Sequence, residues 1–311
     1  MRYIFFNENG RLRSGWRASV FLITYLLIAG AFIFAATLLL AGLPIGPSVG
    51  SYLPITIPFA ISSLIAIVLG WIYGRFIEGL PFCALGFSFR AKWLSHFAAG
   101  IMMGAFALGS AVMVAAMGGG LKLKFNHDSS WPAIQSTLWI TLIVFLIGAI
   151  SEETLFRGYL LQTLTRSHQI IAGIAVTSLL FAFAHIGNPD VGRLAIFNTL
   201  LAGVWFAVAY LKTRDIWFPL GIHFIWNWMQ GPVLGINVSG IGDLSPDPLM
   251  RATDAGPAWF TGGNYGIEGG VACTFAIVLF TVVVYLLPWP GPTEEMMALS
   301  SNEKLVQLDL E

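Results

Sequence analysis

Charge is scarce in this sequence, and its scarcity excludes most soluble folds. Only 10% of the 311 residues are Asp, Glu, Lys or Arg, whereas 57% are hydrophobic and the mean hydropathy is +0.77. An average soluble domain is about 25% charged, and a disordered chain has few hydrophobic residues. The composition therefore predicts an integral membrane protein whose main surroundings are the lipid bilayer.

Two further absences narrow the function. The 16 basic and 16 acidic residues cancel, and the basic residues are spread along the chain, so no nucleic-acid partner is expected. The sequence has only two cysteines, Cys83 and Cys273. One falls in a predicted loop and the other inside the last predicted helix, so their different depths make a disulfide unexpected.

Long runs without charge predict the transmembrane helices. No charged residue occurs between Arg17 and Arg75, and because about 20 apolar residues cross a bilayer as a helix, this run is long enough for two. The break between them falls at residues 42–47, where Gly and Pro gather. The same reasoning predicts an all-α polytopic protein of about eight transmembrane helices, near residues 19–42, 52–74, 93–117, 133–164, 169–187, 194–211, 216–234 and 269–288.

The distribution of Lys and Arg in the loops predicts the orientation in the cell membrane. One side collects eleven of these residues, namely Arg2, Arg11, Arg13, Arg17, Arg75, Arg90, Lys92, Arg166, Lys212, Arg214 and Lys304. The other side has Lys122, Lys124, Arg193 and Arg251. Because cytoplasmic loops are enriched in Lys and Arg, both termini are expected in the cytoplasm.

Three parts of the chain can be distinguished. Residues 1–130 contain the first three helices, residues 131–234 contain helices four to seven, and residues 235–311 contain a Gly- and Asp-rich external loop, the eighth helix and a cytoplasmic tail. The polar residues inside predicted helices concentrate in the second part, which we expect to hold the catalytic core.

Three ionisable residues stand at the end of an uncharged run. Nothing between Ser129 and Ser151 is charged, and then Glu152, Glu153 and Arg157 follow within six positions. Each costs about 2.5–3.5 kcal/mol at a bilayer centre, so such a cluster indicates a functional site. Glu153 and Arg157 are spaced i and i+4 in the order that favours an ion pair. Glu152 points about 100° away around the helix and is left as the candidate general base. A purely structural ion-pair network is the alternative.

Two of the five histidines lie in predicted helices, each four residues from another side chain of interest. His185 follows Phe181, and His223 precedes Asn227. If helices four and five form a hairpin, Glu152 and His185 differ in depth by about 4–5 Å and can face one cavity. His223 and Asn227 offer neighbouring donors of the kind that stabilise an oxyanion, although they could also bridge helices.

The remaining histidines are His96, near a helix start, and His127 and His168 in loops. All three are expected at the surface.

These motifs, in this order, resemble the CPBP family of intramembrane endopeptidases, also called the CAAX-processing or Abi family. The motifs are Glu152-Glu153-x-x-x-Arg157, Phe181-x-x-x-His185 and His223-x-x-x-Asn227. The resemblance covers about residues 130–232. It implies a glutamate-dependent protease with its active site in a cavity within the bilayer, acting on membrane-anchored or lipid-modified proteins.

The resemblance also implies residue roles. Glu152 would activate water with His185, His223 and Asn227 would stabilise the oxyanion, and Arg157 and Glu153 would support them. Phe181 would shape the substrate cavity.

Two other functions stay open. No histidine is followed by glutamate, which excludes a His-Glu-x-x-His zinc site. Glu152, His185 and His223 could still form a three-ligand zinc site, so a zinc-dependent version of the same protease is an alternative to the expected cofactor-free enzyme. The second alternative is a non-catalytic scaffold that binds a partner's transmembrane segment. A transporter is disfavoured because the chain has no internal repeat.

Overall fold

The computed structural model describes residues 2–7, 10, 12–42, 52–89 and 92–301. Within these ranges the protein is mostly helical, with only two short strands. The prediction of an all-α fold is therefore confirmed. Most of the predicted break, residues 43–47, and the part of the tail beyond Ser301 lie outside the described residues.

Eight long helices lie where the uncharged runs predict them, with ends that differ by a few residues. They are α2 (Ser14–Ala41), α4 (Leu53–Ile72), α5 (Trp93–Gly119), α6 (Trp131–Glu153), α8 (Ile170–Ala184), α9 (Arg193–Thr213), α10 (Trp217–Trp228) and α12 (Val271–Leu286). Three of them continue as π-helical turns, η1 (Tyr73–Glu78) after α4, η3 (Thr154–Leu160) after α6 and η4 (Met229–Val233) after α10. The η3 turn runs directly into α7 (Leu161–Arg166).

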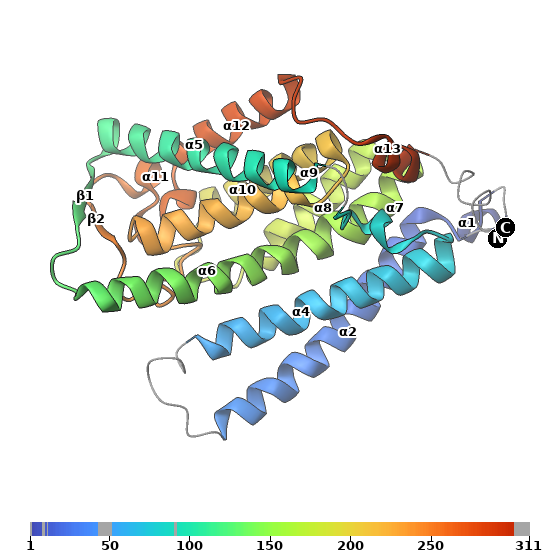
Figure 1. Ribbon diagram of the computed structural model, residues 1–311, viewed down its shortest axis with the longest axis horizontal. Coiled ribbons are helices and arrows are strands. Elements are labelled where there is room, and N and C mark those ends of the chain that lie inside the picture. Colours follow the sequence, from blue (N-terminus) through green and yellow to red (C-terminus); the bar gives the residue numbers. More distant parts are fainter. Residues whose placement is uncertain (1, 8–9, 11, 43–51, 90–91, 302–311) are drawn as a thin grey trace.

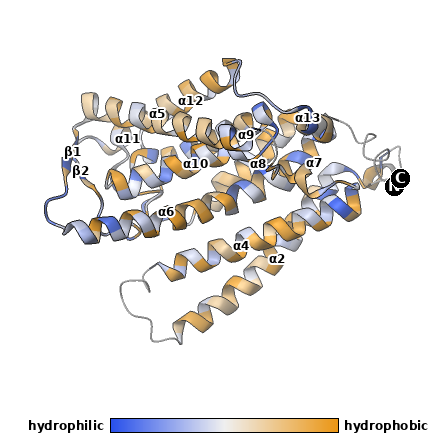
Figure 2. Cartoon of the chain, viewed as in Figure 1, coloured by the Kyte–Doolittle hydropathy of each residue, from blue (hydrophilic) through white to orange (hydrophobic). Residues whose placement is uncertain are grey.

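The helix lengths fit a multi-pass membrane protein. Five helical segments in the described ranges are long and apolar enough to cross a bilayer, and they begin at Ser14, Leu53, Trp93, Trp131 and Arg193. Two apolar helices, α8 and α12, are shorter, with 15 and 16 residues. Apolar residues cover most of each long helix, and Figure 2 shows this pattern along α2 and α4.

The helices form a bundle with a pair of helices beside it. Figure 1 shows α5, α6, α10 and α12 running in similar directions, with α2 and α4 on the far side of α6. One end of the bundle holds the strands β1 (Leu121–Phe125) and β2 (Met250–Asp254), and we call it the sheet end. The opposite end holds α1 (Arg2–Phe5) and α13 (Glu294–Ser301), and we call it the α13 end.

Glycines bring the backbones of α5 and α10 into direct contact. A Cβ atom added at Gly100 would lie 2.3 Å from the carbonyl oxygen of Phe218, and one at Gly104 would lie 2.6 Å from that of Ile222. A Cβ at Gly221 would lie 2.4 Å from the carbonyl oxygen of Phe97. Only glycine allows so close an approach, so these positions fix how α10 sits against α5.

His96 adds a polar contact between the same helices, and the expectation that it lies at the surface is wrong. It is fully buried, and its Nδ1 forms a hydrogen bond with Oδ2 of Asp215. The other carboxylate oxygen of Asp215 accepts from the backbone N–H of Trp217 at 3.1 Å, in the first turn of α10. His96 faces inward because this carboxylate lies opposite it. His127 and His168 are exposed, as expected.

The segment from residue 234 to residue 270 folds back onto the bundle at the sheet end. It contains β2, α11 (Ala258–Thr261), η5 (Gly263–Tyr265) and η6 (Ile267–Gly269). β2 pairs antiparallel with β1 in the register Leu121↔Asp254 to Phe125↔Met250. The Asn198 side chain on α9 donates to the carbonyl oxygens of Glu268 at 2.7 Å and Gly270 at 2.9 Å. These bonds hold η6 against the start of α9.

Candidate active site

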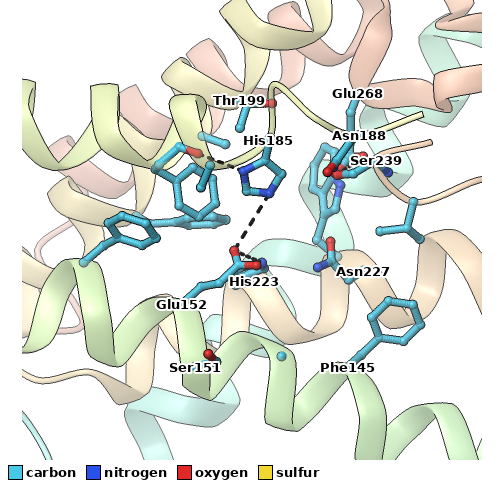
Figure 3. A pocket seen from close by; sticks show the side chains of 18 of the residues that line it. Phe145, Ser151, Glu152, His185, Asn188, Thr199, His223, Asn227, Ser239 and Glu268 are labelled. Atoms are coloured by element: carbon cyan, nitrogen blue, oxygen red, sulfur yellow. Dashed lines mark hydrogen bonds and ion pairs between the residues drawn. The ribbon is translucent and has the colours of Figure 1, made fainter. Parts of the chain in front are cut away.

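A cavity of about 350 Å³ lies between the helices of the second part of the chain and the folded-back segment. Side chains from α6, α8, α9 and α10 line it, together with residues of α2, α4, α12 and the segment around Ser239. Glu152, His185, His223 and Asn227 all line this cavity (Figure 3). The sequence motifs therefore meet in one place although they span 76 positions, from 152 to 227.

Glu153 and Arg157 form the ion pair that their spacing predicts. Arg157 Nη1 lies 3.1 Å from Glu153 Oε1, and both side chains are completely buried. Arg157 Nη2 donates to the carbonyl oxygen of Gly203 at 3.1 Å, and the guanidinium lies 4.8 Å from the ring centre of Phe181 and 5.1 Å from that of Phe206. The pair thus ties α6 and η3 to α8 and α9 from behind the cavity.

Glu152 faces the cavity, on a different side of the helix from Glu153. Its side chain is 23% exposed, whereas that of Glu153 is 0% exposed. Its Oε2 has no hydrogen-bond partner within the described protein. A carboxylate oxygen without a donor, beside a carboxylate that is paired, is the arrangement expected of a general base.

His185 is held by the last turn of α8. Its Nδ1 lies 2.8 Å from the carbonyl oxygen of Phe181, and because a carbonyl only accepts, Nδ1 is the protonated nitrogen. Nε2 therefore points away from the helix, 4.0 Å from Oε2 of Glu152. The i, i+4 spacing of Phe181 and His185 places the imidazole within reach of this carbonyl oxygen. The centre of the Phe181 ring also lies 4.8 Å from that of the imidazole.

His223 reaches both glutamates. Its Nδ1 donates to Glu153 Oε1 at 2.9 Å, and its Nε2 lies 3.8 Å from Glu152 Oε2. The imidazole stacks on the ring of Phe206 at 4.8 Å. The sequence alone paired Glu153 only with Arg157, whereas in the structure one oxygen of Glu153 serves two donors.

Asn227 lies one turn beyond His223, and its side chain makes no hydrogen bond within the described protein. Figure 3 shows its carboxamide facing the cavity from α10, on the side toward Ser239. A free donor at this position is open to a ligand.

The sequence reasoning missed the opposite wall of the cavity. Glu268, Ser239 and Asn188 face the motif residues from the folded-back segment and from the turn after α8 (Figure 3). Ser239 lay in a loop expected to be external, and nothing in the spacing of Glu268 connects it to a helix of the core. The bonds from Asn198 to η6 help to hold it there.

A second missed feature is a chain of hydroxyl groups beside Glu152. The Tyr25 hydroxyl on α2 bonds to Ser62 on α4, and Ser62 Oγ lies 2.7 Å from Oγ of Ser151 on α6. All three residues line the cavity. α2 and α4, which lie outside the motif region, therefore contribute to the wall next to the candidate base.

The described residues contain no group of three or more His, Cys, Asp or Glu side chains placed to hold a metal ion. In a zinc-dependent version of the protein, Glu152, His185 and His223 are the residues that would hold the ion.

Comparison with known protein families points to the part of the chain that holds the motif residues. Residues 134–229 match the family model for Type II CAAX prenyl endopeptidase Rce1-like proteins. All the motif residues, from Glu152 to Asn227, lie inside this match. The resemblance to the CAAX-processing family is therefore confirmed for this part of the chain.

Two curated relatives extend the comparison. An Escherichia coli protein named "Uncharacterized 24.3 kDa protein" is 29% identical over 167 residues, which are 53% of this chain and 71% of that protein. A Bacillus subtilis (strain 168) protein named "Putative membrane peptidase YdiL" is 24% identical over 102 residues, which are 33% of this chain and 40% of that protein. These matches support a membrane protease of the CAAX-processing type.

Proposed function

We propose that this protein is an intramembrane endopeptidase that hydrolyses peptide bonds of membrane-anchored or lipid-modified proteins. The observation that carries the proposal is the approach of two imidazole Nε2 atoms to one unpaired oxygen of Glu152, at 3.8 and 4.0 Å, inside a cavity. A water molecule placed between Glu152 Oε2 and His185 Nε2 would donate one hydrogen bond to each. Separations of about 4 Å suit a bridged contact better than a direct one.

In the proposed reaction Glu152 takes a proton from this water, and the water oxygen forms a bond to the carbonyl carbon. His223 and Asn227 stabilise the oxyanion that results, in a site where donors are worth more than in water. His223 donates from Nε2 as an imidazolium, because Nδ1 already donates to Glu153. The C–N bond then breaks, and Glu152 passes the proton to the departing amine.

Glu153 and Arg157 support this chemistry indirectly. Glu153 holds His223 through its Nδ1, and Arg157 holds Glu153. Phe181 packs against Arg157 and both catalytic histidines. The proposal requires no cofactor.

We further propose that the α13 end faces the cytoplasm at the cell membrane. Arg75 in η1, Arg166 in α7 and Lys212 at the end of α9 gather at that end. Lys122 in β1 and Arg251 in β2 are at the sheet end. This difference follows the enrichment of Lys and Arg in cytoplasmic loops. The substrate would reach the cavity within the bilayer because its hydrophobic segment or lipid chain partitions there, at about 0.8 kcal/mol per buried CH₂.

The test compares new protein N-termini in cells that carry wild-type protein or Glu152→Gln at equal abundance. Glu294→Gln, the same change at an exposed glutamate in α13, is the matched control. Termini that disappear only with Glu152→Gln would support proteolysis and name the substrates. If the termini are identical in all three strains and Glu152→Gln protein still supports the cellular function of the wild type, the scaffold would be favoured.

A further inference from the structure

The cavity that holds Glu152 contains a second carboxylate, Glu268, whose role the family motifs do not assign. Glu268 lies in η6, outside the matched segment 134–229. Its Oε2 accepts hydrogen bonds from the backbone N–H of Ser239 at 2.6 Å and from the Ser239 hydroxyl at 3.0 Å. Figure 3 shows it across the cavity from Glu152, beside Asn188.

The carboxylates that line the cavity have no Lys or Arg beside them in the described part of its wall. Among the described residues that line it, the only carboxylates are Glu152 and Glu268, and none is Lys or Arg. The nearest guanidinium, that of Arg157, is bound to Glu153 behind the wall. Glu268 itself forms no ion pair with Lys or Arg within the described residues. Glu268 is half-buried. A carboxylate that is withdrawn from solvent is normally paired, so one that has no cationic partner in a cavity is a place for a cation to bind.

We propose that Glu268 is the anion of a subsite that binds a cationic group of the substrate, either a Lys or Arg side chain near the cleaved bond or a free N-terminal ammonium. The proposal rests on the proposed endopeptidase function and names its substrate class. Ser239 holds the carboxylate through one oxygen and leaves the other toward the cavity.

The alternative role for Glu268 is purely structural, as a clasp that closes residues 239–268. Three variants separate these roles. Glu268→Gln keeps an oxygen that can accept from Ser239 but removes the charge. Ser239→Ala weakens the clasp but keeps the charge, and Glu268→Asp keeps the charge on a shorter side chain.

The experiment maps protein termini that depend on Glu152 in cells carrying wild-type protein, Glu268→Gln, Ser239→Ala or Glu268→Asp. We expect Lys or Arg enriched at one fixed position from the cleaved bond, or cleavage at a fixed distance from a free N-terminus. These two outcomes identify the source of the cation. In Glu268→Gln the preference should fall about tenfold, as for a hydrogen bond to a charged group. Ser239→Ala and Glu268→Asp should keep it.

Two results would overturn the subsite. One is a set of Glu152-dependent termini without any cationic preference, and the other is a preference that Glu268→Gln leaves unchanged. Absence of Glu152-dependent termini would instead refute the endopeptidase itself, and the subsite with it. If Glu268→Gln protein does not accumulate, the cleavage rates of peptides with Lys or Gln at the preferred position are compared on purified wild-type protein, and equal rates would overturn the subsite.

Discussion

The protein contains two buried clusters in which carboxylates meet arginines, and the clusters differ in how completely their oxygens are paired. Near the α13 end, Glu78 Oε2 lies 2.9 Å from Arg166 Nη2, and its Oε1 accepts from the Thr163 hydroxyl at 2.6 Å and lies 3.7 Å from Arg17 Nε. In the cavity cluster, Glu153 Oε1 takes two donors, whereas Oε2 of Glu153 and Oε2 of Glu152 take none from the described residues, and of these two oxygens the one on Glu152 lies beside both imidazoles.

This difference separates a structural cluster from a candidate catalytic one. Both clusters join helices that are distant in sequence, and both bury charge that would be costly unpaired. Only the second leaves an acceptor open beside two imidazoles. A buried ion pair is therefore a poor marker of function by itself, and the unpaired oxygen next to it is the informative feature.

The largest expected effect belongs to Glu152→Gln. The rate of peptide hydrolysis should fall by about 10²–10⁴, the usual contribution of a general base. The unfolding temperature in detergent should stay close to that of the wild type, because Glu152 Oε2 has no bond to lose. Glu153→Gln provides the contrast, since it removes the carboxylate that pairs with Arg157 and should lower stability by about 3–5 kcal/mol. An active Glu152→Gln protein would contradict the assignment.

Asn227→Ala should reduce the rate by about 10²-fold, because one oxyanion donor contributes about 3 kcal/mol to the barrier. Little change in stability is expected, since the Asn227 side chain makes no hydrogen bond within the described protein. Kinetics on a purified substrate identified from the new termini provide the measurement. Asn264→Ala, at an exposed asparagine of η5, is the control. A rate within twofold of the wild type would remove Asn227 from the site.

Glu78→Gln should affect stability without affecting chemistry. The change leaves Arg17 and Arg166 without their carboxylate, so the free energy of unfolding should fall by about 3–5 kcal/mol. The rate per folded molecule should be unchanged, because Glu78 does not line the cavity. Denaturation in detergent and active-site titration together measure both quantities. A loss of rate in fully folded protein would show that the two clusters are coupled.

A smaller effect is expected from pH at the Glu268 subsite. Burial raises the pKa of Glu268, while hydrogen bonds from Ser239 and the nearby His185 lower it. The carboxyl is therefore protonated at a higher pH than an ordinary Glu, and the preference for a cationic residue should weaken as the pH falls through that raised pKa. Tyr265 and Cys273 are the other titratable groups near it.

The ratio of cleavage rates for matched Lys and Gln substrates, measured against pH, tests this expectation. Glu268→Gln, which has no carboxyl group at this position, serves as the reference. The wild-type ratio should fall more steeply than the ratio for the variant. Parallel curves would show that Glu268 does not cause the pH dependence.

Chelation should have the smallest effect. The proposed reaction uses only Glu152, the two histidines and Asn227, so a chelator should leave the rate of purified protein unchanged. Loss of activity that zinc restores would establish the zinc-dependent alternative, with Glu152, His185 and His223 as the ligands. Metal analysis of the purified protein would then be expected to find about one zinc per chain.

Much of the fold and half of the site follow from the sequence alone. Uncharged runs predict the eight helices because a segment inside a bilayer must pair its own backbone N–H and C=O groups, and a helix does so. The i, i+4 spacing predicts the Glu153–Arg157 pair and the common face of Phe181 and His185, since these contacts lie within one turn of a helix. Local geometry is sufficient for such features.

The contacts that the sequence could not predict all join residues far apart in the chain. Glu153 to His223, Asp215 to His96, and Asn198 to the backbone of Glu268 depend on how helices pack and where a loop returns. No local periodicity encodes them. The wall formed by Glu268 was missed for this reason, and His96 was misplaced because its partner is 119 positions away.

The glycine contacts between α5 and α10 limit how the proposed catalytic core can be trimmed or transplanted. α10 carries His223 and Asn227, and its most extensive contacts are with α5, which lies before residue 131. A fragment restricted to residues 131–234 would expose the bare backbone of α10 where Gly100 and Gly104 normally cover it. A chimaera that keeps the three motifs but replaces α5 must therefore have glycine at the positions of Gly100 and Gly104. Otherwise α10 would shift, and His223 and Asn227 would lose their alignment with Glu152.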